Sequence, residues 1–195
     1  MFFPVVHRSA DASLTDDLAD DPHGAFPGLM SGLAGPVYSL ALRLCGREAA
    51  EDVTQEAFVR AYRALHDYEP ERRRALQVRP WLLTIALNVA RNHVRTEVRN
   101  PRGDNTGLVD RPDPAPGPDA AAQRGDVQAR LASALHRLPV PMREAVVLRH
   151  IAGCATAEAA TILRRPVGTV KAQVSRGLAA LRVDLEIEGL TREDT

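Results

Sequence analysis

The sequence has little sulfur, few aromatic residues and no long apolar run. Its two cysteines, Cys45 and Cys154, are far apart and neither belongs to a C-x-x-C pair, so we expect no disulfide framework and no metal site. Arg8 and a run of Asp follow the apolar residues 1–6, where a secretion signal would continue with apolar residues. No stretch approaches the roughly 18 uninterrupted apolar residues that span a bilayer. We therefore expect a cytoplasmic protein without membrane insertion, and no motif calls for a cofactor.

The chain also lacks net charge, because 25 Lys and Arg balance 25 Asp and Glu. These charges are unevenly distributed: residues 126–182 carry nine basic and three acidic side chains, whereas residues 1–35 carry one basic and five acidic ones. Salt limits the field of each segment to about 10 Å, so a basic segment can bind a polyanion whatever the charge of the whole chain. Neutrality therefore does not exclude a nucleic-acid partner.

Aromatic residues make up 4% of the sequence, so the core must be built mainly from Ala, Leu and Val, a composition that favours helices. No segment alternates between apolar and polar residues with a period of two. A stretch rich in Pro, Gly and Asp, residues 100–125, is typical of a flexible linker. We predict an all-α chain of two small helical domains, 28–99 and 126–183. The acidic segments 1–27 and 184–195 are predicted to be a disordered extension and tail.

In the first domain, apolar residues recur at helical spacing in three runs. They are Leu29, Leu33, Val37, Leu40 and Leu44, with Gly46 at the end of the helix; Val53, Ala57, Ala61 and Leu65; and Leu82, Ile85, Ala86, Val89 and Ala90, after Pro80. The outer face of the third helix is polar, with a cationic far end. We predict three amphipathic helices.

The second domain is predicted to be a helix pair followed by a helix-turn-helix, with Thr156 capping its short helix. The apolar face of the last helix would consist of Val167, Val170, Val174, Leu178 and Leu181. The outward face would then consist of Thr169, Lys171, Ala172, Ser175 and Arg176. Such a helix fits the major groove of DNA, where side chains contact phosphates and base edges. The alternative is a solvated basic face on an ordinary packing helix.

Two patterns in the first domain have more than one interpretation. An acidic and amide patch lies on the second helix, beside Phe58 or Tyr62, which we expect to be exposed. Taken alone, the patch is typical of a solvated face, and catalysis by its carboxylates would need a pocket and a partner that the sequence does not indicate. The patch consists of Glu51, Asp52, Gln55 and Glu56. Trp81 suits a core anchor or base stacking. The polar loop before it, together with the arginines of the third helix, would suit a single nucleic-acid strand.

Both domains resemble the ECF (extracytoplasmic-function) group of the sigma-70 family of RNA polymerase sigma factors. Region 2 of that family is similar to AEDVTQEAFVRAYRAL at 50–65 and RPWLLTIALNVARNHVR at 79–95. Region 4 is similar to LPVPMREAVVLRHIAGCATAEAATILRRPVGTVKAQVSRGLAALR at 138–182, in which PVGTVK at 166–171 is the most specific string. The resemblance implies a subunit that directs bacterial core RNA polymerase to promoters and assists melting, with no catalytic chemistry of its own.

The resemblance also implies roles for particular residues. Family members bind the clamp coiled coil of the polymerase β′ subunit through the second helix of region 2, which implies contacts by Asp52, Gln55, Glu56, Phe58 and Tyr62. The loop before the third helix, about 66–78 here, captures a flipped base of the minus-10 element. The DNA contacts implied for this loop and for the third helix are Asp67, Tyr68, Arg79, Trp81, Asn88, Arg91, Asn92 and Arg95.

Region 4 of the family reads the minus-35 element and touches the polymerase β flap. The implied minus-35 contacts are Arg165, Thr169, Lys171, Ala172, Ser175 and Arg176. An anti-sigma factor is a candidate partner, because such a protein often holds family members. The acidic extension 1–27 is expected to weaken DNA binding by the free chain.

The chain departs from the family pattern in its helix-turn-helix. Arg164 stands where the family usually has Gly, so we expect a strained or altered turn. Ala172, Gln173 and Ser175 also differ from the family, which implies a different base preference. The main alternative function is a free-standing helix-turn-helix transcription regulator. An adaptor that binds polymerase without reading DNA comes next, and an enzyme is the most distant alternative.

Overall fold

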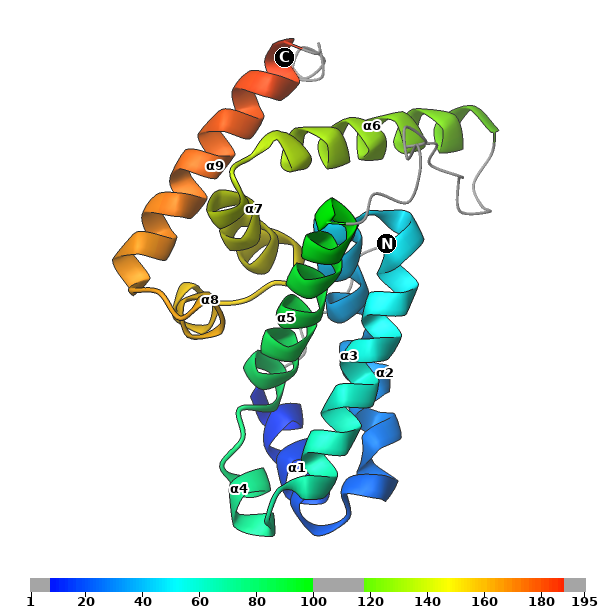
Figure 1. Cartoon of the computed structure of the whole chain (residues 1–195), viewed down its shortest axis with the longest axis vertical. Helices are drawn as coiled ribbons and strands as arrows, with labels where there is room; N and C mark the ends of the chain where they lie inside the picture. The colour runs from blue at the N-terminus through cyan, green and yellow to red at the C-terminus, as the bar shows by residue number, and fades with distance from the viewer. Residues whose placement is uncertain (1–7, 100–117, 188–195) are drawn as a thin grey trace.

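The structure is a computed structural model that describes residues 8–99 and 118–187. Every element within these ranges is a helix, which confirms the predicted all-α fold. Figure 1 shows helices α1 to α5 in one domain and α6 to α9 in a second domain that packs beside α5. The predicted linker between them lies mostly in residues 100–117, outside the described residues.

Three long helices form the core of the first domain: α2 (Pro22–Cys45), α3 (Arg47–Asp67) and α5 (Val78–Arg99). Nearly all the residues that helical spacing placed on their apolar faces are buried, and Ile85 is partly buried. Gly46 ends α2 with a φ of 84°, as its position after the apolar run predicted. Among the described helices, α2 alone is long and apolar enough to cross a membrane, but its apolar face packs against α3 and α5.

The N-terminal segment differs from its prediction. Residues Arg8–Asp20 form helix α1, and α2 begins at Pro22 rather than near residue 28. The reason is local: Leu18, inside the acidic run, is buried in the core, and the Asp21 carboxylate accepts hydrogen bonds from the backbone N–H groups of His23 (3.1 Å) and Gly24 (2.9 Å). Predicted disorder over 1–27 is therefore corrected for residues 8–27. Residues 1–7 lie outside the described part of the chain.

One short helix, α4 (Pro70–Arg74), interrupts the loop between α3 and α5. Pro70 occupies its first turn, where the missing N–H of proline is tolerated. With α1, it lies at the end of the first domain farthest from α6 (Figure 1).

The second domain consists of α6 (Pro118–Arg137), α7 (Val140–Val146), the π-helical turn η1 (Val147–Ile151), α8 (Thr156–Leu163) and α9 (Val167–Ile187). Helix α6 begins inside the predicted linker, 100–125, because the Ala-rich residues after Pro118 favour a helix. At the other end, α9 extends four residues beyond the predicted end of the domain at 183, and the rest of the acidic tail, 188–195, is not described.

Helices α8 and α9 form the predicted helix-turn-helix with two local differences. Thr156 is the first residue of α8 rather than its cap, and the N–H of Ala155 donates to the Glu158 carboxylate at 2.6 Å. Along α9, Val170 and Leu181 are buried as predicted, but Val167 and Leu178 are 51% and 40% exposed. The long α9 extends past the short α7 and α8, so its apolar face is covered only in part.

The turn between α8 and α9 contains the strained residue that the sequence predicted. Arg164 has φ 53° and ψ 48°, the left-handed conformation, and is the only non-glycine residue with positive φ among the described residues. A side chain with a Cβ atom disfavours this conformation by about 1–2 kcal/mol.

Helices α7 and α9 approach each other closely at Gly177. A Cβ atom at this position would lie 2.7 Å from Cγ2 of Val146, a buried residue of α7. The packing of the two helices therefore depends on the missing side chain.

Replacing Arg164 with glycine should stabilise the protein. We expect Arg164→Gly to raise the free energy of unfolding by about 0.5–1 kcal/mol, because glycine adopts φ > 0 without a steric penalty but loses more backbone entropy on folding. Denaturant unfolding followed by circular dichroism measures the change. Arg164→Ala, which removes the charge but keeps a Cβ atom, is the matched control and should give little gain. Equal stabilisation by both variants would contradict backbone strain as the cause.

Replacing Gly177 with alanine should have the opposite effect. We expect a loss of about 1–3 kcal/mol in the free energy of unfolding, because the added methyl group overlaps Val146. Gly168→Ala is the control in the same helix, since no heavy atom lies within 4 Å of its Cβ position. Thermal unfolding distinguishes the two, and Val146→Ala should recover part of the loss in the Gly177→Ala background.

Candidate nucleic-acid and partner interfaces

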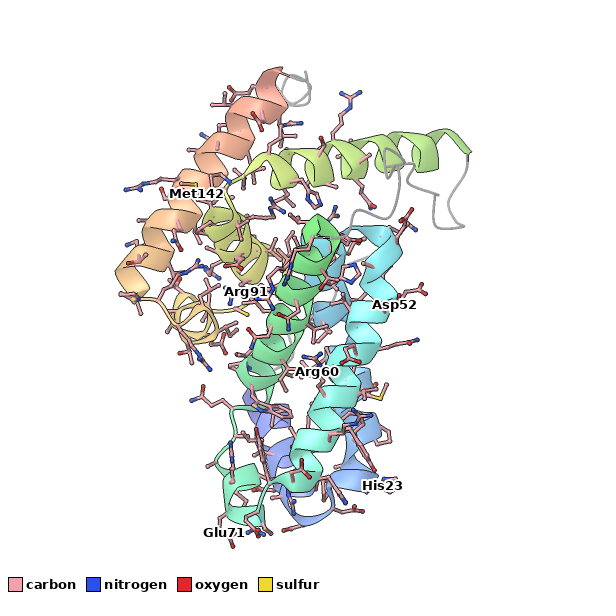
Figure 2. All side chains as sticks on the ribbon, in the orientation of Figure 1. His23, Asp52, Arg60, Glu71, Arg91 and Met142 are labelled. Atoms are coloured by element: carbon pink, nitrogen blue, oxygen red, sulfur yellow. The ribbon has the colours of Figure 1, made fainter. Side chains whose placement is uncertain are left out.

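An apolar groove with a volume of about 690 Å³ lies between α2 and α3. Its main lining residues are Phe26, Met30, Gln55, Phe58, Val59 and Tyr62. The groove therefore includes three of the five side chains that the resemblance implied for polymerase binding. The other two, Asp52 and Glu56, are exposed on α3, and Asp52 projects from the outer side of this helix (Figure 2).

Packed aromatic rings give the groove a fixed shape. The ring of Phe26 meets the rings of Phe58 and Tyr62 edge-on, at centroid distances of 6.3 and 5.1 Å. Tyr62 also stacks on His66 and shares a 2.9 Å hydrogen bond between its hydroxyl and Nδ1 of His23. Phe58, expected to be exposed beside the acidic patch, is buried because it packs against Phe26 and the core.

A second cluster lies on the loop before α5. The rings of Tyr68 and Trp81 are 6.3 Å apart, and the guanidinium carbon of Arg72 lies 3.7 Å from the centre of the Tyr68 ring. Both aromatic residues are half-buried, so Trp81, in the first turn of α5, contacts the core and remains accessible, while Asp67 is exposed at the end of α3. Arg72 lies within the predicted loop but had no predicted contact.

On the polar face of α5, some residues are exposed to solvent and others bond to the second domain. Asn88, Asn92 and Arg95 are exposed, and Arg95 donates to the Asn92 side chain at 2.9 Å. Arg79 and Arg91 instead contact the second domain: Nη2 of Arg79 donates to the carbonyl of Ala152, and Arg91 reaches Glu144. Figure 2 shows Arg91 between α5 and α7.

Glu144 is the centre of the contact between the domains. Its side chain is only 3% exposed. It accepts hydrogen bonds from Nε (2.6 Å) and Nη2 (2.8 Å) of Arg91 and from Nη2 of Arg165 (2.8 Å). The bond to Glu144 raises the pKa of the Arg91 guanidinium.

Glu144 was not among the predicted functional residues. A signal was present, because it is the only acidic residue between Asp126 and Glu158 in an otherwise basic domain.

On the helix-turn-helix, the implied minus-35 residues fall into two groups. Thr169, Lys171, Ser175 and Arg176 are exposed and Ala172 is half-buried, so α9 presents a polar outer surface. Arg165 points inward instead, where it donates to Glu144, to the carbonyl of Pro141 and to the Gln173 side chain.

Neither cysteine forms a reactive or metal-binding site in this arrangement. Burial raises the pKa of the Cys45 thiol to about 12 and that of the Cys154 thiol to about 11, so both are protonated at neutral pH. Within residues 8–99 and 118–187, no cluster of three or more His, Cys, Asp or Glu side chains could hold a metal ion.

Both domains match known protein families. The Sigma-70 region 2 model matches residues 29–100, and the Sigma-70, region 4 model matches residues 128–181. The RNA polymerase sigma-H factor of Pseudomonas aeruginosa is 32% identical over 154 residues, which cover 75% of this chain and 77% of the relative. The ECF RNA polymerase sigma factor SigC of Mycobacterium tuberculosis is 33% identical over 143 residues, which cover 73% and 74%.

Solved structures share the arrangement of the helices. CnrH in complex with the cytosolic domain of CnrY aligns with a TM-score of 0.68 and 27% identity, over 91% of this chain and 98% of that one. The sigma factor RpoE of Bartonella quintana, in complex with the anti-sigma factor NepR, has the same fold, with a TM-score of 0.64 and 23% identity over 83% of this chain and 97% of that one. With two matching regions in the family's order and relatives above 30% identity, this chain belongs to the ECF group of sigma-70 family RNA polymerase sigma factors.

Proposed function

We propose that this sigma factor binds core polymerase through the groove between α2 and α3 and the acidic residues beside it. The observation that carries this proposal is the combination of an open apolar groove, aromatic side chains and exposed carboxylates on one helix pair. Protein interfaces commonly place aromatic anchors at the centre and charged residues at the rim. Asp52 and Glu56 supply such a rim, and a partner with basic side chains, such as the clamp coiled coil, would complement it.

The two DNA elements would be read by different domains. Tyr68, Trp81 and the exposed face of α5 would hold the separated non-template strand of the minus-10 element, because aromatic rings stack on bases and arginines neutralise phosphates. Helix α9 would enter the major groove of the minus-35 element with Lys171 and Arg176 outward. Lys171 is the only lysine of the sequence, so arginine provides the remaining basic side chains.

Promoter melting would require no catalytic chemistry from this chain. Capture of unpaired bases on the loop offsets the free energy of unstacking, which amounts to a few kcal/mol per base. The protein would act in the cytoplasm with polymerase and without a cofactor. A further proposed partner is an anti-sigma factor, supported by the structural relatives that were solved as complexes, CnrH with the cytosolic domain of CnrY and RpoE with the anti-sigma factor NepR.

In the closed arrangement of the two domains, two of the proposed minus-10 contacts are already used. Arg79 is bonded to Ala152 and Arg91 to Glu144, both in the second domain. DNA binding by these arginines would therefore require the domains to separate. Glu144 would keep its bond to Arg165 after separation, because both belong to the second domain.

The polymerase surface is tested by charge reversal. We expect Asp52→Arg/Glu56→Arg to weaken binding to bacterial core RNA polymerase by about tenfold or more, equivalent to about 1.4 kcal/mol, because it reverses the rim of the groove. Size-exclusion co-elution and a fluorescence titration measure the affinity. Asp16→Arg/Glu71→Arg changes the net charge equally at exposed positions outside the groove and should bind normally.

Two results would count against this assignment. Equal losses in both charge-reversal variants would indicate a non-specific charge effect rather than a contact surface. A folded wild-type chain, shown to be free of any inhibitor, that does not bind core polymerase would favour the free-standing helix-turn-helix regulator.

The domain contact is tested by the conformation of the free chain. Hydrogen bonds to charged groups contribute about 1.5–3 kcal/mol, so Arg91→Gln should raise the population with separated domains by about tenfold or more. Small-angle scattering, or energy transfer between dyes placed on the two domains, measures this population. Arg95→Gln is the matched control, since Arg95 lies one turn later on α5 and its hydrogen bond within the described part of the chain is to Asn92 of the same helix. A similar opening in both variants would show that Glu144 does not hold the domains together.

A further inference from the structure

The short helix α4 lies in the loop proposed to hold the minus-10 strand, and it has no buried residue of its own. Five residues form little more than one turn, and so short a helix is unstable without outside contacts. Its sequence, Pro70–Arg74, contains three consecutive arginines. The contacts of these side chains show what holds the loop in place.

The middle arginine, Arg73, links α4 to the C-terminal ends of α1 and α3. Its Nε and Nη2 atoms donate to the carbonyl of Ala19 at 3.2 and 2.8 Å, in the last turn of α1. Its Nη1 atom donates to the carbonyls of Leu65 (3.2 Å) and Tyr68 (2.6 Å), at the end of α3. The last carbonyls of a helix have no partner within the helix, and a cation is favourable at this end of the helix dipole. One guanidinium group thus caps both α1 and α3.

The neighbouring arginines have different contacts. Arg72 lies over the ring of Tyr68. Arg74 pairs with Asp20 at 2.5 Å, but both side chains are largely exposed, at 49% and 72%. Surface pairs of this kind contribute little to stability. Among these three arginines, only Arg73 has its whole hydrogen-bonding fork directed at backbone carbonyls of other elements.

These contacts connect Arg73 to the proposed strand-binding cluster. Arg73 donates to the Tyr68 carbonyl, and the ring of Tyr68 contacts the Arg72 guanidinium and lies 6.3 Å from the ring of Trp81. We propose that Arg73 is a positioning residue for the minus-10 strand: it holds Tyr68 and α4 in place by tying them to the C-terminus of α1. This inference rests on the proposed function, because it assumes that the loop binds the strand.

The proposal also changes the expected effect of the acidic N-terminal segment. From charge alone, removing it should strengthen DNA binding. Because α1 supplies the Ala19 carbonyl and packs against α4, its removal should instead weaken binding of the separated strand.

The test uses holoenzyme, assembled from bacterial core polymerase and the full chain. The probe is the single-stranded DNA that wild-type holoenzyme enriches most strongly from a short random-sequence pool. We expect Arg73→Ala to reduce affinity for this probe by about tenfold or more, because a loop that is no longer preorganised must be ordered on binding. Arg74→Ala, the matched control, removes the same charge from the same helix and should cost only a few-fold.

Two readouts separate positioning from a direct phosphate contact. Losing a contact to a single strand lowers the slope of log affinity against log salt by about 0.7, whereas losing a positioning residue should leave this slope unchanged. Arg73→Lys keeps the charge but not the planar fork, so it should bind the probe nearly as weakly as Arg73→Ala. Deleting residues 1–20 should have a similar effect, with little additional loss when combined with Arg73→Ala.

Several outcomes would overturn the proposal. Restoration of binding by Arg73→Lys, a lowered salt slope, or equal losses from Arg73→Ala and Arg74→Ala would each show that Arg73 acts through its charge. Co-elution of every variant with core polymerase excludes misfolding. If Arg73→Ala does not form holoenzyme, the binding of the probe by Arg73→Lys decides whether Arg73 acts through its geometry or its charge. If wild-type holoenzyme enriches no strand, the proposed function fails together with this inference. If wild-type holoenzyme binds the probe and the Arg73 variants bind it equally well, the positioning role of Arg73 is rejected while the proposed function stands.

Discussion

A buried carboxylate, that of Glu144, lies at the centre of the hydrogen bonds between the two domains, beside the bond from Arg79 to the carbonyl of Ala152. An ionised Glu144 removed from water is stable only if hydrogen bonds and opposite charges replace its solvation. Two guanidinium groups do so, one from each domain, and they use three donated hydrogen bonds. The same bonds join α5 to α7 and engage Arg91, one of the arginines proposed to contact the minus-10 strand. The contact between the domains and the proposed DNA surface therefore share one side chain.

The two partners of Glu144 are not equivalent. Arg165 belongs to the helix-turn-helix domain and also bonds to Pro141 and Gln173, so it stays with Glu144 whatever the other domain does. Arg91 belongs to the other domain, so its hydrogen bonds to Glu144 break when the domains separate. When the domains separate, the Glu144 carboxylate keeps its hydrogen bond to Arg165 and is not left buried without a partner. Separation therefore costs less free energy than breaking an isolated buried ion pair, and the closed form can open reversibly. A buried pair with no third member would make separation far less favourable.

Local periodicity predicted most of the fold. The apolar runs that include Leu33, Ala57 and Leu82 are buried as their spacing required, and Arg164 has the strained turn expected from a non-glycine residue. The residues that were missed act over long sequence separations: Glu144 meets a residue 53 positions away and Arg73 meets one 54 positions away. Helical spacing gives no signal for such pairs, and the isolated acidic residue in a basic stretch, Glu144, indicates a partner without identifying it. Helix α1 was missed because an acidic composition outweighed the few apolar side chains that anchor it, Leu14, Leu18 and Ala19.

The contacts of Arg73 constrain the identity of one residue only, Arg73 itself, and this affects how the sequences of relatives are compared. All three of its partners are backbone carbonyls, which every amino acid possesses. Ala19, Leu65 and Tyr68 can therefore change identity without removing an acceptor, whereas no other side chain reproduces the planar fork of arginine. Such a link leaves no pair of positions that must mutate together. Methods that infer contacts from correlated substitutions would not detect it, although it joins helices α1, α3 and α4.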